Sequence, residues 1–206
     1  YPDDLVIVTK VGARRGSDAS WIPAMSPAEL RQAVHDNLRN LGLDVLEVVN
    51  LRSMLGIHGP VEGSLEAPLS ALAELQQQGL IRHIGLSNVT ARQVEDARRI
   101  CDIACVQNHY NLVYREEERE MIPLCQDQGV GLIPWSPLAR GFLAGNRKSD
   151  DAKAGETSRA QTDDIAQKYY YGESDFAVVQ ALTELARSRG LSNATLAYAW
   201  LLHKGI

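Results

Sequence analysis

The stretch GVGLIPWSPLARGFLAG, residues 129–145, says more about the fold class than any other part of this chain. Val130 to Pro134 is a short apolar run directly after a glycine, which is typical of a buried parallel strand. Trp135 and Ser136 then end the strand. They place an aromatic face and a small hydroxyl at its carboxyl end, where α/β folds bind their ligands. An ordinary strand exit whose tryptophan fills the core would suit the same residues.

Upstream of this stretch, apolar runs alternate with helical patterns. The runs predict strands at 5–8, 43–51, 80–86 and 103–106, and the helical spacings predict helices at 26–41, 64–78, 90–100 and 116–128. Downstream, a long polar and aperiodic stretch at 145–172 precedes two further predicted helices, at 175–189 and 192–203. Alternation of this kind predicts a parallel sheet with helices packed outside it. A (β/α)8 barrel and an open doubly wound sheet both fit, but no G-x-G-x-x-G follows any strand to support a dinucleotide-binding site of the second kind.

Composition narrows the class of protein. The chain has 206 residues, of which 45% are hydrophobic and 23% charged, enough for one large domain with a core. A net charge of −5 and the lack of a basic stripe argue against nucleic-acid binding. No run reaches the roughly 18 apolar residues of a membrane span, and the first residues do not resemble a signal peptide. Three cysteines without a C-x-x-C pair predict reduced thiols in a cytoplasmic protein and no metal site.

Polar or aromatic side chains follow each predicted strand. In chain order they are Lys10, Arg52, Ser87 with Asn88, Gln107 with Asn108, and Trp135 with Ser136. A closed barrel gathers the carboxyl ends of all its strands at one mouth, so these side chains would then face a common centre. The alternative is that they are ordinary polar residues that cap loops.

Four short motifs resemble the aldo-keto reductase family, in the same order and at about the same spacing. They are Val8-Thr9-Lys10, Ile84-Gly85-Leu86-Ser87-Asn88, Val106-Gln107-Asn108-His109-Tyr110-Asn111 and Pro134-Trp135-Ser136-Pro137-Leu138. The resemblance covers essentially the whole chain. It implies a (β/α)8 TIM barrel that reduces carbonyl compounds with a nicotinamide cofactor, usually NADPH, with NADH not excluded.

The resemblance also implies roles for individual residues. Lys10 matches the lysine of the family's catalytic tetrad, which lowers the pKa of a tyrosine acid, as a neighbouring ammonium group does for a phenol. Trp135 matches the aromatic residue that stacks on the nicotinamide ring. Ser87, Asn88 and Gln107 match the residues that hydrogen-bond the nicotinamide carboxamide. Ser136, Leu138 and Gly141 match the loop that runs along the pyrophosphate.

The tetrad's histidine is replaced in this chain. Its position falls on Arg52, or on Asn50 if the register slips by two, and strand alternation puts both on the same face. An arginine does not lose its proton, so it could only orient or polarise a carbonyl oxygen. This arginine-bearing version resembles bacterial reductases allied to pyridoxal reductases.

The tetrad's aspartate and tyrosine have no counterpart here, because the chain begins at the third strand of the family pattern. We therefore expect an incomplete barrel that covers roughly the third to seventh strands with their helices, in a single domain, residues 1–206, truncated at both ends. The isolated fragment should be inactive.

The resulting functional prediction is NADPH-dependent reduction of small aldehydes or ketones to alcohols, with a small carbonyl substrate as the partner and the oligomeric state unknown. The alternative is a cofactor-binding regulatory module like the potassium-channel β subunits, or a catalytically dead fragment. Arg14, Arg15 and Trp21 follow Lys10 near the expected mouth. They are either substrate contacts or residues of a surface loop.

Overall fold

The structure is a computed structural model that describes residues 1–2, 4–18, 20–56, 59–145, 147 and 164–205. It divides into two compact units. Unit 1 comprises residues 1–108 and 118–133, and unit 2 comprises residues 109–117 and 134–206.

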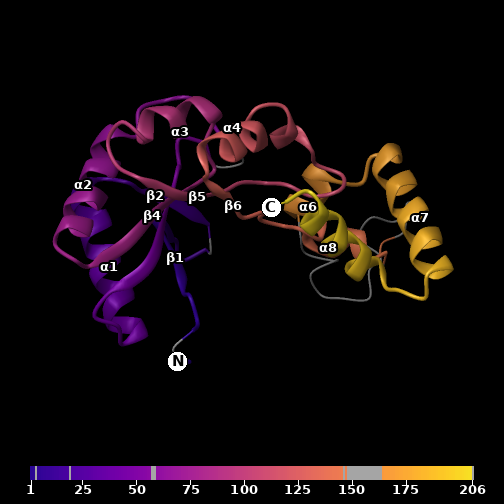
Figure 1. Cartoon of the computed structure of the whole chain (residues 1–206), viewed down its shortest axis with the longest axis horizontal. Helices are drawn as coiled ribbons and strands as arrows, with labels where there is room; N and C mark the ends of the chain where they lie inside the picture. The colour runs from indigo at the N-terminus through magenta and orange to yellow at the C-terminus, as the bar shows by residue number, and fades with distance from the viewer. Residues whose placement is uncertain (3, 19, 57–58, 146, 148–163, 206) are drawn as a thin grey trace. The chain divides into compact units, whose positions relative to one another are not determined.

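Unit 1 is built on one six-stranded sheet with the order β2-β1-β3-β4-β5-β6 (Figure 1). The strands are β1 (Val8–Arg15), β2 (Trp21–Ala24), β3 (Leu46–Arg52), β4 (Ile81–Ser87), β5 (Ile103–Gln107) and β6 (Gly131–Leu132). β1, β3, β4, β5 and β6 run parallel, and only β2 runs antiparallel to its neighbour β1. The predicted alternation of strands and helices around a parallel sheet is therefore confirmed.

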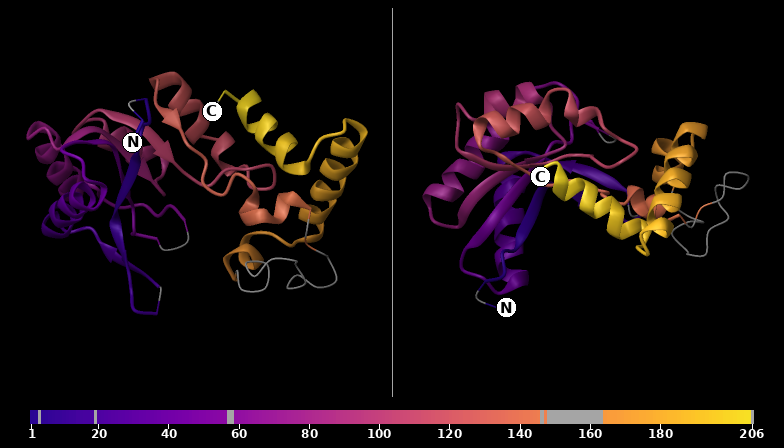
Figure 2. Two further views of the ribbon diagram at one scale, coloured as in Figure 1. Left: turned by 90° about the horizontal axis from the view of Figure 1, so that it is seen from below. Right: turned by 45° about the vertical axis from the view of Figure 1, so that its right-hand side comes forward.

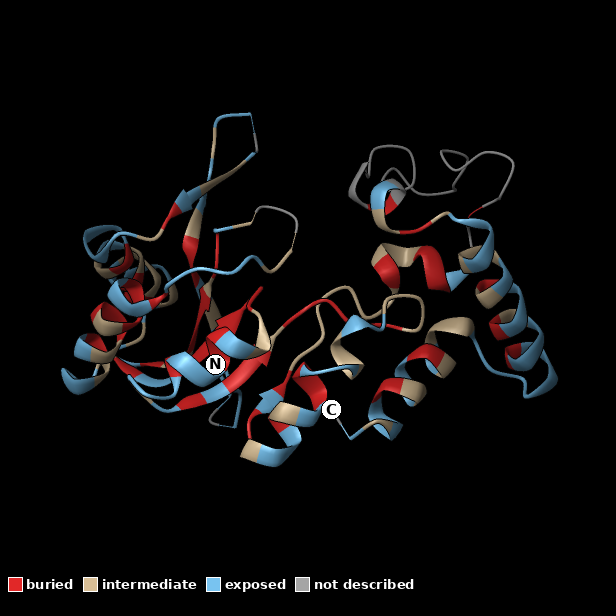
Figure 3. Cartoon of the chain, turned by 90° about the horizontal axis from the view of Figure 1, so that it is seen from above, coloured by how far each residue is buried: buried red, intermediate tan, exposed pale blue. Residues whose placement is uncertain are grey.

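The helices of unit 1 are α1 (Pro27–Leu41), α2 (Glu66–Gln77), α3 (Ala91–Ala97) and α4 (Met121–Gln128). α1 shows why the sequence forms them: Ser26 caps its first turn in a capping box with Glu29, and Leu30, Val34 and Leu38 repeat at helical spacing and are buried. In Figure 3 the buried residues gather on the strands and on the helix faces turned towards them. Within the described residues, no helix is long and apolar enough to cross a membrane.

The prediction for the first strand was wrong in its bounds. The strand was expected at 5–8, but β1 begins at Val8, extends to Arg15 and pairs with β2 as a hairpin. Gly12 shows how β1 continues past its polar residues: its φ is 101°, and a Cβ there would lie 2.4 Å from the carbonyl oxygen of Arg52. This close approach between β1 and β3 is tertiary, so the local pattern does not reveal it. The helix expected at 116–128 is also divided, into a 3-10 turn η1 (Glu116–Glu118) and α4.

Unit 2 contains the 3-10 segment η2 (Ala139–Ala144) and the helices α6 (Asp164–Tyr169), α7 (Glu173–Ser188) and α8 (Asn193–His203). α7 and α8 match the two helices predicted for this region, and they follow one another along the chain in Figure 2. α6 lies inside the stretch expected to be aperiodic, of which residues 146 and 148–163 are outside the described part. The core of unit 2 joins η2 to these three helices through Phe142, Leu143, Ala166, Tyr170, Val179, Leu182 and Ala197.

Candidate active site

Three predicted site residues of unit 1 lie in one row across the sheet. Arg52 on β3 pairs in register with Ser87 on β4, and Ser87 pairs with Gln107 on β5. Each is the last residue of its strand. Neighbours in register on parallel strands point to the same face, so the row presents a guanidinium, a hydroxyl and an amide side by side at the carboxyl edge of the sheet.

A second row lies two residues earlier on the same face. It contains Lys10, Asn50, Gly85 and Cys105, paired in register across β1, β3, β4 and β5. Asn50 is fully buried and its Oδ1 accepts a hydrogen bond from the Cys105 thiol at 3.4 Å. Its Nδ2 has no hydrogen-bond partner in the part of the chain that the structure describes. Arg52 and Asn50, the two candidates for the position of the family's tetrad histidine, therefore lie on the same face of β3. Arg52 is at the strand end and Asn50 is two residues before it.

The cations of these rows affect one another. The pKa of Lys10 is lowered from 10.5 to about 8, first by partial removal of water and then by the charge of Arg52, although part of its side chain is exposed. The pKa of Arg52 is lowered by burial and by the charge of Arg15. At neutral pH, Lys10 therefore remains mostly protonated, although it loses its proton at a lower pH than an ordinary lysine.

Asn88 and Asn108 fix the backbone that follows β4 and β5. Asn88 has a left-handed φ of 64°. Its N–H donates to Oδ1 of Asn108 at 2.9 Å, and the N–H of Val89 donates to the same oxygen at 3.1 Å. The Nδ2 of Asn88 donates to the carbonyl oxygen of Gly56 at 3.2 Å. The amide of Asn88 thus connects the loops after β3 and β4, and Asn108 holds the loop that carries it.

The remaining predicted residues lie in unit 2, where an aromatic stack surrounds His109. The imidazole of His109 lies between Tyr114 and Trp135, at centroid distances of 3.9 and 4.0 Å and interplanar angles of 14° and 10°. His109 Nε2 also hydrogen-bonds the hydroxyl of Tyr170. One face of Trp135, the predicted nicotinamide platform, is therefore covered by His109.

The stack is held in a neutral state by its surroundings. His109 is only 4% exposed, and burial together with the charge of Arg140 lowers its pKa from 6.5 to about 3. Burial also raises the pKa of the Tyr170 hydroxyl. At neutral pH, both groups are uncharged and act as hydrogen-bonding partners.

The predicted pyrophosphate loop, residues 136–141, has an unusual backbone. Ser136, Ala139 and Arg140 have positive φ values of 54°, 48° and 57°, and Gly141 has a φ of 96°. The N–H groups of Ala139 and Gly141 donate to the carbonyl oxygens of Ser136 and Leu138, at 2.8 and 2.9 Å. Positive φ at non-glycine residues costs energy and is concentrated at ligand-binding segments. The loop conformation is therefore compatible with the predicted pyrophosphate-binding role. In this conformation two of its N–H groups are already satisfied.

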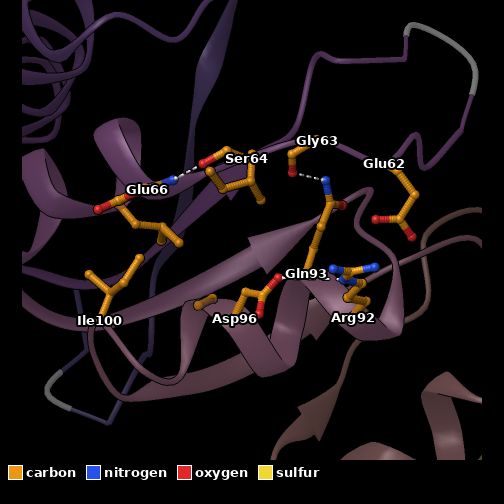
Figure 4. A pocket seen from close by; sticks show the side chains of 11 residues that line it. Glu62, Gly63, Ser64, Glu66, Arg92, Gln93, Asp96 and Ile100 are labelled. Carbon is orange, nitrogen blue, oxygen red and sulfur yellow. Dashed lines mark hydrogen bonds and ion pairs between the residues drawn. The ribbon is translucent and has the colours of Figure 1, made fainter.

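A cavity of about 530 Å³ lies elsewhere in unit 1, beside the first turns of α2 and α3 (Figure 4). Glu62, Glu66, Asp96 and Arg92 contribute charges to its wall. The Gln93 amide donates to the carbonyl oxygen of Gly63 at 2.9 Å. None of the predicted site residues lines this cavity. The strand-end rows, where the ionisable groups perturb one another, are the better candidate.

Sequence reasoning did not assign roles to two residues that organise unit 2, His109 and Tyr170. His109 follows Gln107 and Asn108 in the family motif at residues 106–111, and Tyr170 is the middle of three consecutive tyrosines. A buried histidine beside a polar strand exit could have been singled out from the sequence. Its pairing with Tyr170, 61 residues away, could not.

Known proteins agree with the class that this geometry defines, a parallel β/α sheet with polar residues at its carboxyl edge. A sequence model described as the aldo/keto reductase family matches residues 1–206. The chain is 64% identical over 143 residues to pyridoxine 4-dehydrogenase from Escherichia coli, covering 69% of this chain and 49% of that protein. It is 36% identical over 189 residues to versiconal hemiacetal acetate reductase from Aspergillus parasiticus, covering 86% and 51%.

Solved structures show the same fold. A glycerol dehydrogenase from Gluconobacter oxydans matches with a TM-score of 0.80 at 24% identity, covering 99% of this chain and 62% of that one. An aldo-keto reductase from Bacillus halodurans, in its holo form, matches with a TM-score of 0.57 at 29% identity, covering 68% and 46%. The chain belongs to the aldo-keto reductase family, and it spans about half the length of the curated relatives it matches. The predicted family and its (β/α)8 barrel class are confirmed, with five parallel strands of the eight in the described residues.

Proposed function

We propose that the protein containing this chain reduces small aldehydes or ketones to alcohols with NADPH. The observation that carries the proposal is the row of Arg52, Ser87 and Gln107 at the ends of adjacent parallel strands, with Lys10 on the same face one row below. Membership of the aldo-keto reductase family supports this assignment. The balanced reaction takes an aldehyde, NADPH and a proton to an alcohol and NADP⁺.

The cofactor supplies the hydride, and residues of this chain fit its binding. Ser87 and Gln107 offer a hydroxyl and an amide side by side, the donor and acceptor types that a carboxamide needs. The nicotinamide ring would stack on the face of Trp135 that His109 leaves uncovered. We assign Ser136, Leu138 and Gly141 to the pyrophosphate. We assign Asn88, whose loop is held by Asn108, to the carboxamide.

Two cations would serve the reacting carbonyl. Lys10, whose pKa is lowered to about 8, would favour ionisation of the tyrosine acid that the family resemblance implies. Arg52 stays protonated and would donate hydrogen bonds to the carbonyl oxygen, where negative charge develops during hydride transfer.

Lysine-to-methionine exchange tests the proposal in the full-length protein. NADPH consumption is followed with 4-nitrobenzaldehyde and with the aldehyde that corresponds to pyridoxine, the compound named for the Escherichia coli relative. Lys10→Met should lower kcat by about 100-fold or more, because the acid loses its tuning charge. Lys168→Met, on the exposed surface of α6, is the matched control and should keep the wild-type rate.

The results distinguish a reductase from a cofactor-binding regulatory module. A wild-type protein that binds NADPH but reduces neither aldehyde would contradict the proposal and favour the regulatory module. A Lys10→Met protein with wild-type kcat would rule out the tuning role.

The cofactor site is tested separately by titrating NADPH against tryptophan fluorescence. Trp135→Ala should weaken binding by roughly 1–2 kcal/mol through lost stacking, and Trp135→Phe should restore most of it. Equal affinities in the three proteins would remove Trp135 from the site.

A further inference from the structure

A cluster of two arginines and one tryptophan lies beside the strand-end row of unit 1. The guanidinium carbon of Arg15 lies 3.5 Å from the centroid of the Trp21 ring, and that of Arg52 lies 4.3 Å from it. Arg15 and Trp21 face one another across the β1–β2 hairpin, and Arg52 ends the neighbouring strand β3. The hairpin therefore brings a second guanidinium next to the arginine at the histidine position.

Stacking on the indole orients both guanidinium groups. A guanidinium stacked over the face of a tryptophan is held in a fixed orientation by a cation–π interaction. Arg52 has five N–H donors, and within the described residues its side chain forms no ion pair and donates no hydrogen bond. The side chain is thus pre-organised with its donors unused.

Positive charge is concentrated in this region. Lys10, Arg52 and Arg15 form a chain of neighbouring cations, because Arg52 lowers the pKa of Lys10 and Arg15 lowers that of Arg52. In the part of the chain that the structure describes, neither Lys10 nor Arg52 is paired with a carboxylate. Like charges held together are costly unless an anion joins them.

We propose that Arg15 and Arg52, held over Trp21, bind an anionic group of the carbonyl substrate, either a carboxylate or a phosphate. This inference rests on the proposed function and specifies its substrate class. Guanidinium groups match the planar or trigonal oxygens of both anions with paired N–H donors. Arg15 and Arg52 over Trp21 would hold the anionic group, while Arg52 and Lys10 would face the carbonyl.

A series of matched aldehydes tests this substrate class in the full-length protein. The neutral member is 4-methylbenzaldehyde, and the anionic members are 4-carboxybenzaldehyde and 4-formylphenyl phosphate, which distinguish carboxylate from phosphate. We expect kcat/KM with NADPH to be at least about 10-fold higher for one anionic member than for the neutral one. Arg15→Gln should reduce that preference by about 10-fold.

Arg14→Gln is the matched control, because strand alternation turns Arg14 to the other face of β1, where its charge acts on Glu29. It should change the preference by less than about twofold, the range of a surface charge change. Each aldehyde is compared between variants, so differences in intrinsic reactivity cancel.

The outcomes distinguish this inference from the proposed function. Reduction of all three aldehydes without an anionic preference would overturn the anion site and leave the reductase function standing. An equal loss of preference in Arg14→Gln and Arg15→Gln would show general attraction by surface charge, and would also overturn it. Failure to reduce any of the aldehydes, or the pyridoxine-derived one, would contradict the proposed function itself.

Discussion

The two units place their candidate site residues by different physical means. In unit 1, Arg52, Ser87 and Gln107 are brought together by strand register, a property of the backbone that hydrogen bonds enforce at every residue. In unit 2, an isolated parallel backbone bridge joins Trp135 to His109, and the stacked rings of Tyr114, His109 and Trp135 and the hydrogen bond from His109 to Tyr170 hold the side chains around it.

The two arrangements should respond differently to side-chain substitution and to pH. A registered row is distributed over many backbone hydrogen bonds, so one side-chain change leaves its neighbours in place. A stack around one buried ring depends on that ring and on its ionisation state. We therefore expect unit 2 to be sensitive to acid and to single polar substitutions, and the rows of unit 1 to be sensitive mainly to steric intrusion between the strands.

Acidification should produce the largest difference in stability between the two units. His109 has a folded-state pKa of about 3 and an unfolded value of 6.5, so the unfolded chain binds more protons as the pH falls from 6.5 towards 3. Its contribution to stability is complete above pH 6.5 and is lost through this window, by up to about 4 kcal/mol. Hydrogen exchange at pH 7 and 4 should show lost protection in residues 109–117 and 164–205. In His109→Phe, which keeps a ring but cannot ionise, the pH dependence should be weaker; an unchanged dependence would contradict the assignment.

Two buried asparagines offer a matched test of independence. Asn108 holds the backbone of Asn88 and Val89 in unit 1. Asn111 accepts from the N–H groups of Val113 and Tyr114 in unit 2. Each alanine variant should lose about 3 kcal/mol, because buried N–H groups are left unsatisfied. Hydrogen exchange should locate each loss in the variant's own unit. Losses spread equally over both units would mean that the two fold as one.

Glycine substitutions probe the rows of unit 1. A Cβ on Gly85 would lie 2.0 Å from Oδ1 of Asn50 and 2.7 Å from the Cys105 sulfur, whereas one on Gly131 would meet nothing closer than 3.5 Å. Gly85→Ala should therefore destabilise the protein by about 2 kcal/mol, as over-packing of a core does. Gly131→Ala, on the same face two strands away, should change stability by less than about 0.5 kcal/mol. Urea denaturation measures both, and equal midpoints would contradict the crowding at Gly85.

The smallest effect is expected at the helix caps. Ser26 caps α1 within a capping box, and Ser192 caps α8 by accepting from the N–H of Thr195 at 3.0 Å. Ser26→Ala should cost about 1 kcal/mol and Ser192→Ala about 0.5–1 kcal/mol. Thermal unfolding followed by circular dichroism gives both values. A larger loss at Ser192 would show that unit 2 depends on its local helix signals more than on its aromatic core.

The sequence by itself determined the alternation of strands and helices, because hydrophobic spacing and capping residues act within a few positions. The helix that begins after Ser26 and the unit 2 helices α7 and α8 were predicted without tertiary information, whereas α6 was not. The ordered motifs also identified the family. The apolar run at 43–51 placed Arg52 at the carboxyl end of its strand, where the register puts it beside Ser87.

Only the tertiary structure decided which of these residues meet. The β1–β2 hairpin, which sets Arg15 opposite Trp21, was not predicted, and β1 also approaches β3 closely at Gly12. The stacking of Arg15 and Arg52 on Trp21 and the pairing of His109 with Tyr170 likewise join residues far apart in the chain. Contacts of this kind depend on the path of the backbone through space, which a local pattern of side chains does not encode.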